Sequence, residues 1–370
     1  MNILINCTNL KAGGGLQVAD SICCELNNFP NHHFWVVLSS GLNNTKKKIA
    51  AYKNAEVYTY DICNNLKTLL LGRDVFLDSL VKDNQIDAVL TVFGPSRWIP
   101  RTKHLCGFAR AQLLLTDSPY YDFISFKERL LFRLWTWAFK RSSKCFYTEN
   151  SLISSMLPQL LGDIKVYTVT NYYNQVFDVP SQWSRTIKLP EFHGATVLSI
   201  SSNGAWKNMK ITADIARFFV THYPSFQFRF VMTLSEDEAI FVTDDIKEHF
   251  CLIGKVDVSE CPNLYEQADV MFMPSLMECF TATYPEAMRM EVPIVTTDLT
   301  YAHGLCGEAA CYYDAMSAKA AADAIYMVAT VKDYAQKLVS NGQKQLLKFD
   351  NYEQRTEKLI SILEEIAEKN

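Results

Sequence analysis

The strongest constraint on the fold is an alternation of short apolar runs with helical stretches, which continues through most of the chain. Continuous apolar runs indicate strands that are buried on both faces, as in a parallel sheet covered by helices on each side. In the first half the runs lie at 3–5, 33–38, 56–60, 88–92, 104–108, 144–148 and 166–169. In the second half they lie at 197–200, 226–232, 251–253, 270–273 and 294–295. The pattern therefore predicts an α/β protein with two doubly wound parallel sheets.

A break in the alternation separates the two halves. Residues 179–194 contain Pro180, Pro190 and Gly194 without a sustained period, which is typical of a linker. The chain of 370 residues is long enough for two domains of ordinary size. The predicted parts are a first domain at 1–180, a linker at 181–194, a second domain at 195–351 and a terminal helix at 352–370.

The composition is that of an ordinary globular protein. Hydrophobic residues make up 49% of the chain and charged residues 21%. No run of apolar residues is long enough to span a bilayer, and the first residues lack the layout of a signal peptide. The 11 cysteines are scattered without paired Cys-x-x-Cys motifs, which favours reduced thiols in a cytoplasmic protein.

The segment 278–286 is the strongest functional signal, because it carries two carboxylates eight positions apart. It follows the apolar run 270–273 and the turn Pro274-Ser275, and a helix is expected to start within it. Carboxylates such as Glu278 and Glu286 can accept hydrogen bonds from the vicinal hydroxyls of a sugar or a ribose. The N–H groups at a helix start can bind a diphosphate. The segment therefore suits a sugar nucleotide, although an ordinary solvated helix start would also contain two acids.

In each half of the chain, one further motif follows the first predicted strand. Lys207-Asn208 comes after the apolar run 197–200, where a lysine can meet a phosphate, although a surface lysine is the alternative. The Gly13-Gly14-Gly15 loop follows the run 3–5 and would let a ligand approach the backbone, or form a plain turn. Its spacing does not fit the Gly-x-Gly-x-x-Gly fingerprint of dinucleotide binding.

The stretch from 270 to 295 resembles the signature of the family 4 retaining glycosyltransferases, which have the GT-B fold and a Glu-x7-Glu motif. Their usual pattern is Pro-Ser, then Glu-Gly-Phe-Gly, then Glu-Ala-Met, then Gly-x-Pro. The matching residues are Pro274-Ser275, Glu278-Cys279-Phe280-Thr281, Glu286-Ala287-Met288 and Glu291-Val292-Pro293. Three family glycines are replaced, by Cys279, Thr281 and Glu291. An arginine that the family commonly has five positions before the lysine falls on Ser202.

The resemblance implies two Rossmann-like domains that face each other across a cleft. It implies that Glu286 binds the donor ribose, and that Glu278 faces the donor sugar and stabilises positive charge at its ring. Lys207 is expected to be the second catalytic residue and to neutralise the leaving diphosphate. The remaining donor-binding residues implied are Phe280, Thr281, Ala282, Gly14, Gly15, Lys210 and Ser202. In this family the last helix usually packs back on the first domain.

The first domain offers fewer candidates. Many family members have a histidine at the end of a first-domain strand, but here the run 104–108 ends in Ala109-Arg110, and His104 lies near its start. Arg110 is therefore a candidate on the acceptor side, with a purely structural role as the alternative. No histidine pair has the spacing of metal ligands, and no Asp-x-Asp follows a strand. We expect no cofactor and no metal requirement.

The predicted activity is transfer of a hexose from a nucleoside diphosphate sugar to a hydroxyl acceptor, with retention of anomeric configuration. Carbohydrate and lipid-linked acceptors fit, which suggests synthesis of a surface polysaccharide or a glycolipid. An inactive sugar-nucleotide-binding protein is the main alternative, because several family residues are replaced. A Rossmann-type oxidoreductase is opposed by the missing glycine fingerprint. Nucleic-acid binding is not expected, because the pI is near 6 and no binding module is recognisable.

A basic, aromatic helix is predicted between residues 126 and 139, with a basic flank that continues to Lys144. The stretch from 123 to 144 contains six lysines and arginines and a single acid, Glu128. Aromatic and leucine side chains are interleaved with these cations, a pattern that is typical of helices on anionic membrane surfaces. The pattern predicts a cytoplasmic protein that binds peripherally to the inner face of a membrane. A domain-packing helix with a solvated basic rim is the alternative.

Overall fold

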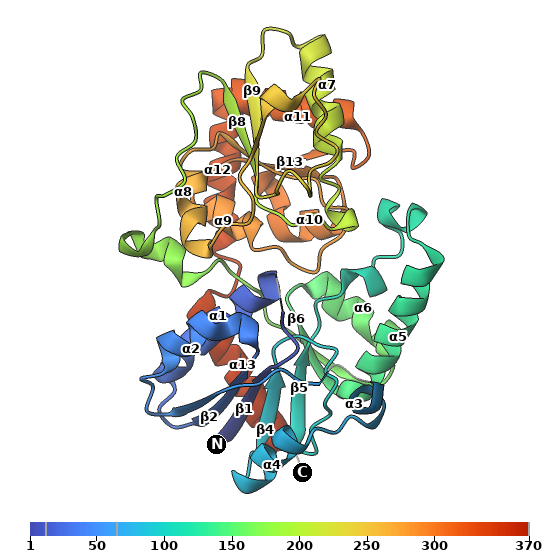
Figure 1. Cartoon of the computed structure of the whole chain (residues 1–370), viewed down its shortest axis with the longest axis vertical. Helices are drawn as coiled ribbons and strands as arrows, with labels where there is room; N and C mark the ends of the chain where they lie inside the picture. The colour runs from blue at the N-terminus through green and yellow to red at the C-terminus, as the bar shows by residue number, and fades with distance from the viewer. Residues whose placement is uncertain (12, 64–65, 369–370) are drawn as a thin grey trace. The chain divides into compact units, whose positions relative to one another are not determined.

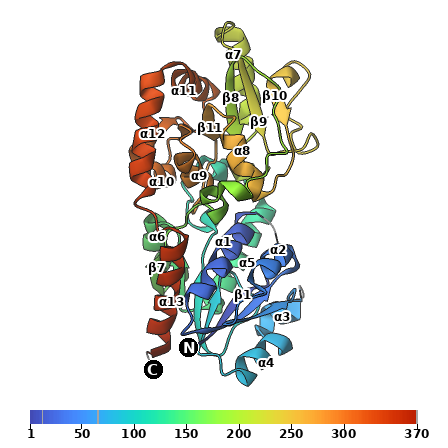
Figure 2. The same cartoon turned by 90° about the vertical axis from the view of Figure 1, so that its left-hand side faces the viewer.

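The computed structural model describes residues 1–11, 13–63 and 66–368, and it divides into two α/β units (Figures 1 and 2). The first unit contains Met1–Leu114, Ile124–Asn174 and the C-terminal stretch from Asp350. The second unit contains Leu115–Phe123 and Gln175–Phe349. Each unit has its own parallel sheet, so the prediction of two doubly wound α/β domains is confirmed.

The sheet of the first unit has seven parallel strands in the order β3-β2-β1-β4-β5-β6-β7. In the register of the central strands, Ile3 lies opposite Phe34 on one side and Ala88 on the other. The strands are β1 (Asn2–Cys7), β2 (His33–Leu38), β3 (Ala55–Thr59), β4 (Ala88–Thr91), β5 (Lys103–Gly107), β6 (Cys145–Thr148) and β7 (Lys165–Thr168).

Helices cover both faces of this sheet, which is why its strands are apolar without alternation. Ile3 and Ile5 of β1 pack in one core with α1 and α13, whereas Leu4 packs on the other face with Leu77 of α4. The helices are α1 (Gly14–Glu25), α2 (Asn43–Ile49), α3 (Leu66–Leu71), α4 (Val75–Asp83), α5 (Phe126–Ser142), α6 (Ser151–Leu161) and α13 (Tyr352–Glu368).

The sheet of the second unit has six parallel strands in the order β10-β9-β8-β11-β12-β13, the arrangement of dinucleotide-binding folds. Val197 and Phe272 pack against Phe219 of α7 on one face, and Leu198 and Met271 are buried on the other. The strands are β8 (Ala195–Ser199), β9 (Phe228–Met232), β10 (Phe250–Leu252), β11 (Val270–Met273), β12 (Ile294–Thr297) and β13 (Ala310–Tyr313). The helices are α7 (Ile211–His222), α8 (Cys261–Tyr265), α9 (Thr283–Arg289), α10 (Thr300–Cys306), α11 (Ala318–Thr330) and α12 (Lys332–Leu346).

Two stretches without regular periodicity are attached to the second unit by hydrogen bonds. In the stretch predicted as a linker, the backbone N–H of Ser184 donates to the Ser259 carbonyl at 2.9 Å. In the short segment Leu115–Phe123, the Ser118 hydroxyl donates to the Leu276 carbonyl at 2.6 Å. These contacts make both stretches part of the second unit's surface.

The last helix, α13, is part of the first unit's core. Leu359 and Leu363 are fully buried in the same cluster as β1 and α1, and Figure 2 shows α13 alongside α1. Arg355 is also buried; its guanidinium donates to the Asn171 side chain and, at 2.6 Å, to the Ser21 hydroxyl of α1. The helix is therefore fixed by both apolar packing and a buried polar anchor.

A buried carboxyl group, Glu149, follows β6 in this same core. Burial raises the pKa of Glu149 to about 8, although the positive charge of Arg355 opposes the shift. The protonated, neutral form is thus favoured in the folded protein, because an ionised carboxylate is costly to bury.

We predict that Glu149→Gln removes a pH dependence of stability. The unfolded carboxyl ionises near pH 4.3, whereas the folded one keeps its proton up to about pH 8. Between these values the native state binds more protons, so the free energy of unfolding of the wild type falls as pH rises. Urea denaturation should show that the variant gains stability relative to the wild type between about pH 5 and pH 8. An exposed control, Glu357→Gln, should show no such trend; an equal difference at both pH values for Glu149→Gln would contradict the assignment.

Candidate functional site

The candidate site lies at the carboxyl ends of β8 and β11, which are neighbours in the sheet of the second unit. The strand order reverses between these two strands. From β8 the chain continues to β9 and β10 on one side of the sheet, whereas β11 is followed by β12 and β13 on the other side. Ligands of open α/β sheets bind at such a switch point. The loop after β8 carries Lys207 and the loop after β11 carries Glu278, so the topology brings these two residues together.

Lys207 and Glu278 form an ion pair in which Nζ lies 2.5 Å from Oε1. Their side chains are only 15% and 10% exposed, so the pair is screened from water more than a surface ion pair would be. The two residues predicted to be catalytic are thus in direct contact, although they are 71 positions apart in the sequence.

The loop that carries Glu278 is fixed by hydrogen bonds on both sides. The N–H of Leu276 donates to the carbonyl of Trp206, next to Lys207, at 2.7 Å. The Ser275 carbonyl accepts from the Thr297 hydroxyl at 2.8 Å and from the Tyr301 hydroxyl at 2.6 Å. Because the backbone is held at two consecutive residues, the Glu278 side chain is positioned before any ligand binds.

Three of the backbone N–H groups between Glu278 and the start of α9 are available to a ligand. In the described part of the chain, the N–H groups of Phe280, Thr281 and Ala282 have no hydrogen-bond partner. The hydroxyls of Thr281 and Thr283 are 2.8 Å apart, and the Phe280 ring contacts Phe349 edge-on. These N–H groups are donors that an anionic ligand could use.

Glu286 lies in the first turn of α9 and is only 3% exposed. Its Oε2 accepts a hydrogen bond of 3.1 Å from the Tyr265 hydroxyl. Burial raises the pKa of Glu286 to about 7, and the bond from Tyr265 opposes the shift. Among the described residues, the carboxylate of Glu286 thus accepts a hydrogen bond only from Tyr265, and Glu286 is not part of the Lys207–Glu278 pair.

The two other predicted donor residues of this unit are exposed and lie outside the ion pair. Ser202 lies in the loop after β8, and its carbonyl accepts a bond of 3.3 Å from Ser201. Lys210 lies just before α7, and its Nζ is 5.3 Å from the centre of the Phe123 ring. The structure therefore places Lys207 at the carboxylate, whereas Lys210 contacts an aromatic ring.

Two unusual backbone conformations explain residue choices in the motifs. Asn208 has a left-handed conformation, with φ of 50° and ψ of 31°, which asparagine tolerates better than most residues. Its buried side-chain nitrogen has no partner among the described residues. Glu291 has φ of 59° in the turn before β12, which gives a steric reason for the glycine that the resembling family has there.

Gly14 and Gly15 begin α1, in the first unit. The preceding Gly13 has φ of 76°, so the loop needs glycine there. A Cβ on Gly14 would meet no described atom within 4 Å, whereas one on Gly15 would come within 3.3 Å of Leu10. Gly14 is therefore not required by packing within the described chain.

Arg110 and His104 belong to the first unit and have different surroundings. Arg110 is half-buried, and its guanidinium lies 4.3 Å from the centre of the Trp135 ring. His104 is buried, with ring nitrogens 2.9 Å from the Thr91 hydroxyl and 2.8 Å from the Ser142 carbonyl. Burial lowers the pKa of His104 to about 4, so it is a neutral, structural residue.

Two residues of the site were missed by the sequence analysis. Tyr265 bonds to Glu286, and Tyr301 holds the loop that carries Glu278; both are almost fully buried. A buried tyrosine usually needs a hydrogen-bond partner. The sequence places each tyrosine in a short helix but does not identify its hydrogen-bond partner.

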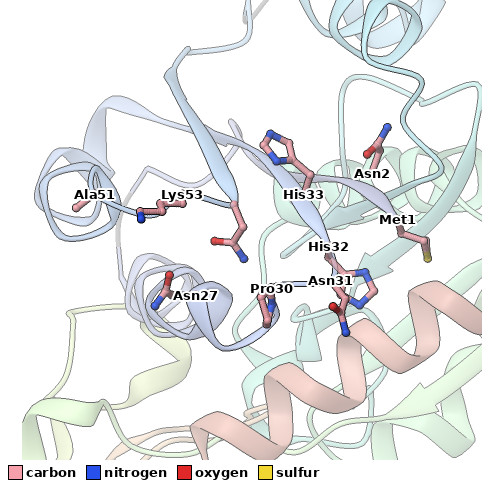
Figure 3. Close-up of a pocket in the computed structure, with 10 residues that line it drawn as sticks. Met1, Asn2, Asn27, Pro30, Asn31, His32, His33, Ala51 and Lys53 are labelled. Atoms are coloured by element: carbon pink, nitrogen blue, oxygen red, sulfur yellow. The ribbon is translucent and has the colours of Figure 1, made fainter.

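A separate surface hollow of about 630 Å³ lies in the first unit (Figure 3). It is formed at the amino ends of β1 and β2 by residues that include Asn2, His32, His33 and Lys53. This is the edge of the sheet opposite to the one that binds ligands in α/β folds, so we assign it no role. No group of three or more potential metal ligands is found in the described residues.

Comparison with known protein families finds a match for part of the second unit. Residues 196–331, which include Lys207, Glu278 and Glu286, match the family model "Glycosyl transferases group 1". A comparison with curated protein sequences finds no match.

Solved structures resemble the whole chain. A glycosyltransferase from Rickettsia africae ESF-5 is 15% identical with a TM-score of 0.72, covering 100% of this chain and 99% of that one. Sucrose-phosphate synthase from Thermosynechococcus elongatus is 13% identical with a TM-score of 0.71, covering 99% and 98%. Anabaena HepE in complex with UDP and glucose is 16% identical with a TM-score of 0.68, covering 99% and 100%. The chain therefore has the GT-B fold of glycosyltransferases, and its second unit carries the match to the group 1 family.

Proposed function

We propose that the protein transfers a sugar from a nucleoside diphosphate sugar to a hydroxyl acceptor. The observation that carries this proposal is the Lys207–Glu278 pair at the switch point of the second sheet, beside three N–H groups without partners. An anion binder, a carboxylate and several backbone donors in one place suit a diphosphate joined to a sugar. The family match over 196–331 supports the same reading.

The donor is bound by its phosphates, its ribose and its sugar. Lys207 and the N–H groups of Phe280, Thr281 and Ala282 bind the diphosphate, and the exposed Lys210 and Ser202 contribute at the edge. Glu286 accepts hydrogen bonds from the ribose hydroxyls. In the first unit, Gly14 and Gly15 allow a close backbone approach to the donor. UDP is the first nucleotide to test, because the structural relative HepE was solved with UDP and glucose.

In the transfer step, the bond between the anomeric carbon and the diphosphate oxygen breaks, a bond to the acceptor oxygen forms, and the proton of the acceptor hydroxyl passes to the leaving diphosphate. Positive charge develops on the sugar ring as the diphosphate leaves. Glu278 stabilises this charge, while Lys207 stabilises the negative charge on the leaving group. The Glu-x7-Glu motif supports retention of the anomeric configuration. These residues supply both signs of charge, so we propose that the reaction needs neither a metal ion nor a cofactor.

The acceptor is proposed to be a carbohydrate or a lipid-linked hydroxyl that binds on the side of Arg110. A role in making a surface polysaccharide or a glycolipid follows, with the protein in the cytoplasm at the inner face of a membrane. A sugar-nucleotide-binding protein without activity is the second candidate, because Cys279 and Thr281 replace glycines of the resembling family. Release of UDP from UDP-sugars distinguishes the two.

We predict that Glu286→Ala weakens UDP binding by about ten- to more than a hundredfold. This range corresponds to roughly 1.5–3 kcal/mol for a lost hydrogen bond to a charged group. Isothermal titration calorimetry measures the Kd directly. The control is Tyr265→Phe, which removes the bond to Glu286 but keeps its carboxylate. If Glu286 only stabilises the fold, neither substitution will change UDP affinity, and the ribose assignment is wrong.

We predict that Glu278→Gln lowers kcat and kcat/KM together, by about a hundredfold or more, while UDP affinity changes little. The reason is that stabilisation of the developing charge exists only in the transition state. UDP release from the donor measures turnover, and thermal unfolding checks that Lys207, now without its partner, has not disrupted the loop. A matched control is Glu266→Gln, which removes a carboxylate paired with Arg185 on the exposed surface. Unchanged turnover in Glu278→Gln would exclude the catalytic role.

A further inference from the structure

The surface formed by α5 and α3 of the first unit exposes large apolar side chains to solvent. Phe126 is 79% exposed and Leu130 is 59% exposed, although both residue types are usually buried. Two further α5 residues and two α3 residues belong to this surface. Apart from Leu131, which is also exposed on α5, the exposed apolar residues of the two helices are Phe126, Leu130, Leu134, Trp137, Leu70 and Leu71. We call this set the α3–α5 surface.

The α5 members form one stripe along the helix. Phe126, Leu130, Leu134 and Trp137 follow each other at intervals of four, four and three residues, so they lie on the same face. The opposite face of α5 packs inward through the buried Phe139 near the helix end. The exposed stripe is therefore separate from the face that holds α5 on the first unit.

Arg141 joins α3 to the end of this stripe, and Figure 1 shows α3 beside α5. Its guanidinium donates to the carbonyls of Leu69 at 2.9 Å and Leu70 at 2.7 Å. The same guanidinium lies 4.5 Å from the centre of the Trp137 ring. The hydrogen bonds of Arg141 thus hold α3 against the end of α5, and the exposed leucines of α3 extend the apolar stripe of α5.

Cations flank the stripe on both sides. Lys127, Arg129, Arg133 and Lys140 are all exposed, and none of the ion pairs between described residues involves any of them. The one carboxylate of α5, Glu128, forms a capping box with Ser125 at the start of the helix. Its carboxylate is therefore engaged at the start of the helix.

We propose that the α3–α5 surface docks on an anionic lipid bilayer. A helix with an apolar stripe between rows of lysine and arginine can bury the stripe among acyl chains while its cations contact lipid phosphates. A second copy of the chain fits poorly, because pairing this surface with itself would bring like charges together. A polyanion such as a nucleic acid would contact the cations but leave the stripe in water. No helix in the described parts of the chain could span a membrane.

The test is co-sedimentation of the full chain with vesicles that contain phosphatidylglycerol, compared with vesicles of phosphatidylcholine alone. Vesicle binding does not need turnover, so its result is independent of the proposed transferase activity. The wild type should bind the anionic vesicles at low salt and dissociate as salt rises, because salt screens the attraction. Pure phosphatidylcholine should bind the protein at least about tenfold more weakly.

Two variants separate the charged and apolar parts of the surface. Arg129→Glu/Arg133→Glu/Lys140→Glu should weaken binding at least about tenfold. Leu130→Ser/Leu134→Ser keeps every charge and should also weaken binding about tenfold, because it removes apolar burial. The matched control, Lys47→Glu/Lys53→Glu/Lys188→Glu, changes the net charge equally at exposed sites elsewhere and should bind like the wild type.

Several outcomes would overturn the proposal. Absence of wild-type binding at low salt would do so, as would equal loss of binding in the charge-reversal variant and its control. If the leucine variant binds as well as the wild type, the surface recognises polyanions and does not insert into a bilayer. If sedimentation without vesicles shows a dimer that the leucine variant abolishes, the surface is a self-association interface.

Discussion

The ion pair between Lys207 and Glu278 is the interaction on which the candidate site depends. It joins the loops that follow two neighbouring strands, β8 and β11, at the point where the strand order of the sheet reverses. Removing one member of a shielded pair leaves a charge without its partner, which is costly. A diphosphate that binds Lys207 would replace the carboxylate as its partner and leave Glu278 available to the sugar. The pair thus holds the site in place without a ligand and would be reorganised when the donor binds.

The presence of two parallel sheets was predictable because parallel strands that are buried on both faces leave continuous apolar runs in the sequence. Strand β13 was not predicted, since Ala310–Tyr313 is short and bounded by no clear turn signal. Helix α6 was also missed, and it contains Pro158, a residue that normally argues against a helix interior. The attachment of Leu115–Phe123 to the second unit depends on a tertiary hydrogen bond from Ser118, and local sequence patterns do not encode such a contact.

The site was predictable in its residue types and only partly in its geometry. Lys207 and Glu278 were named from two separate motifs, and their contact follows once the strand order is known. The surroundings of Glu286 could not be predicted, because its partner Tyr265 lies in another helix, 21 residues earlier. The amphipathic pattern of α5 indicated either a membrane helix or a packing helix. The exposure of Phe126 and Leu130 in the structure is what favours the membrane. The roles of Lys207, Glu278 and Glu286 remain predictions, as do those of Gly14, Gly15 and Arg110.

The most direct test of the account is calorimetric titration of UDP, GDP, ADP and NAD into the wild type and Lys207→Met. At least one nucleoside diphosphate should bind the wild type at one site per chain, and NAD should not bind. The lysine substitution should weaken this binding at least about tenfold, because a charge-assisted bond to phosphate is lost. Binding of NAD alone, absence of nucleotide binding, or equal affinity in the Lys207→Met variant would contradict a nucleotide-sugar site at the ends of β8 and β11.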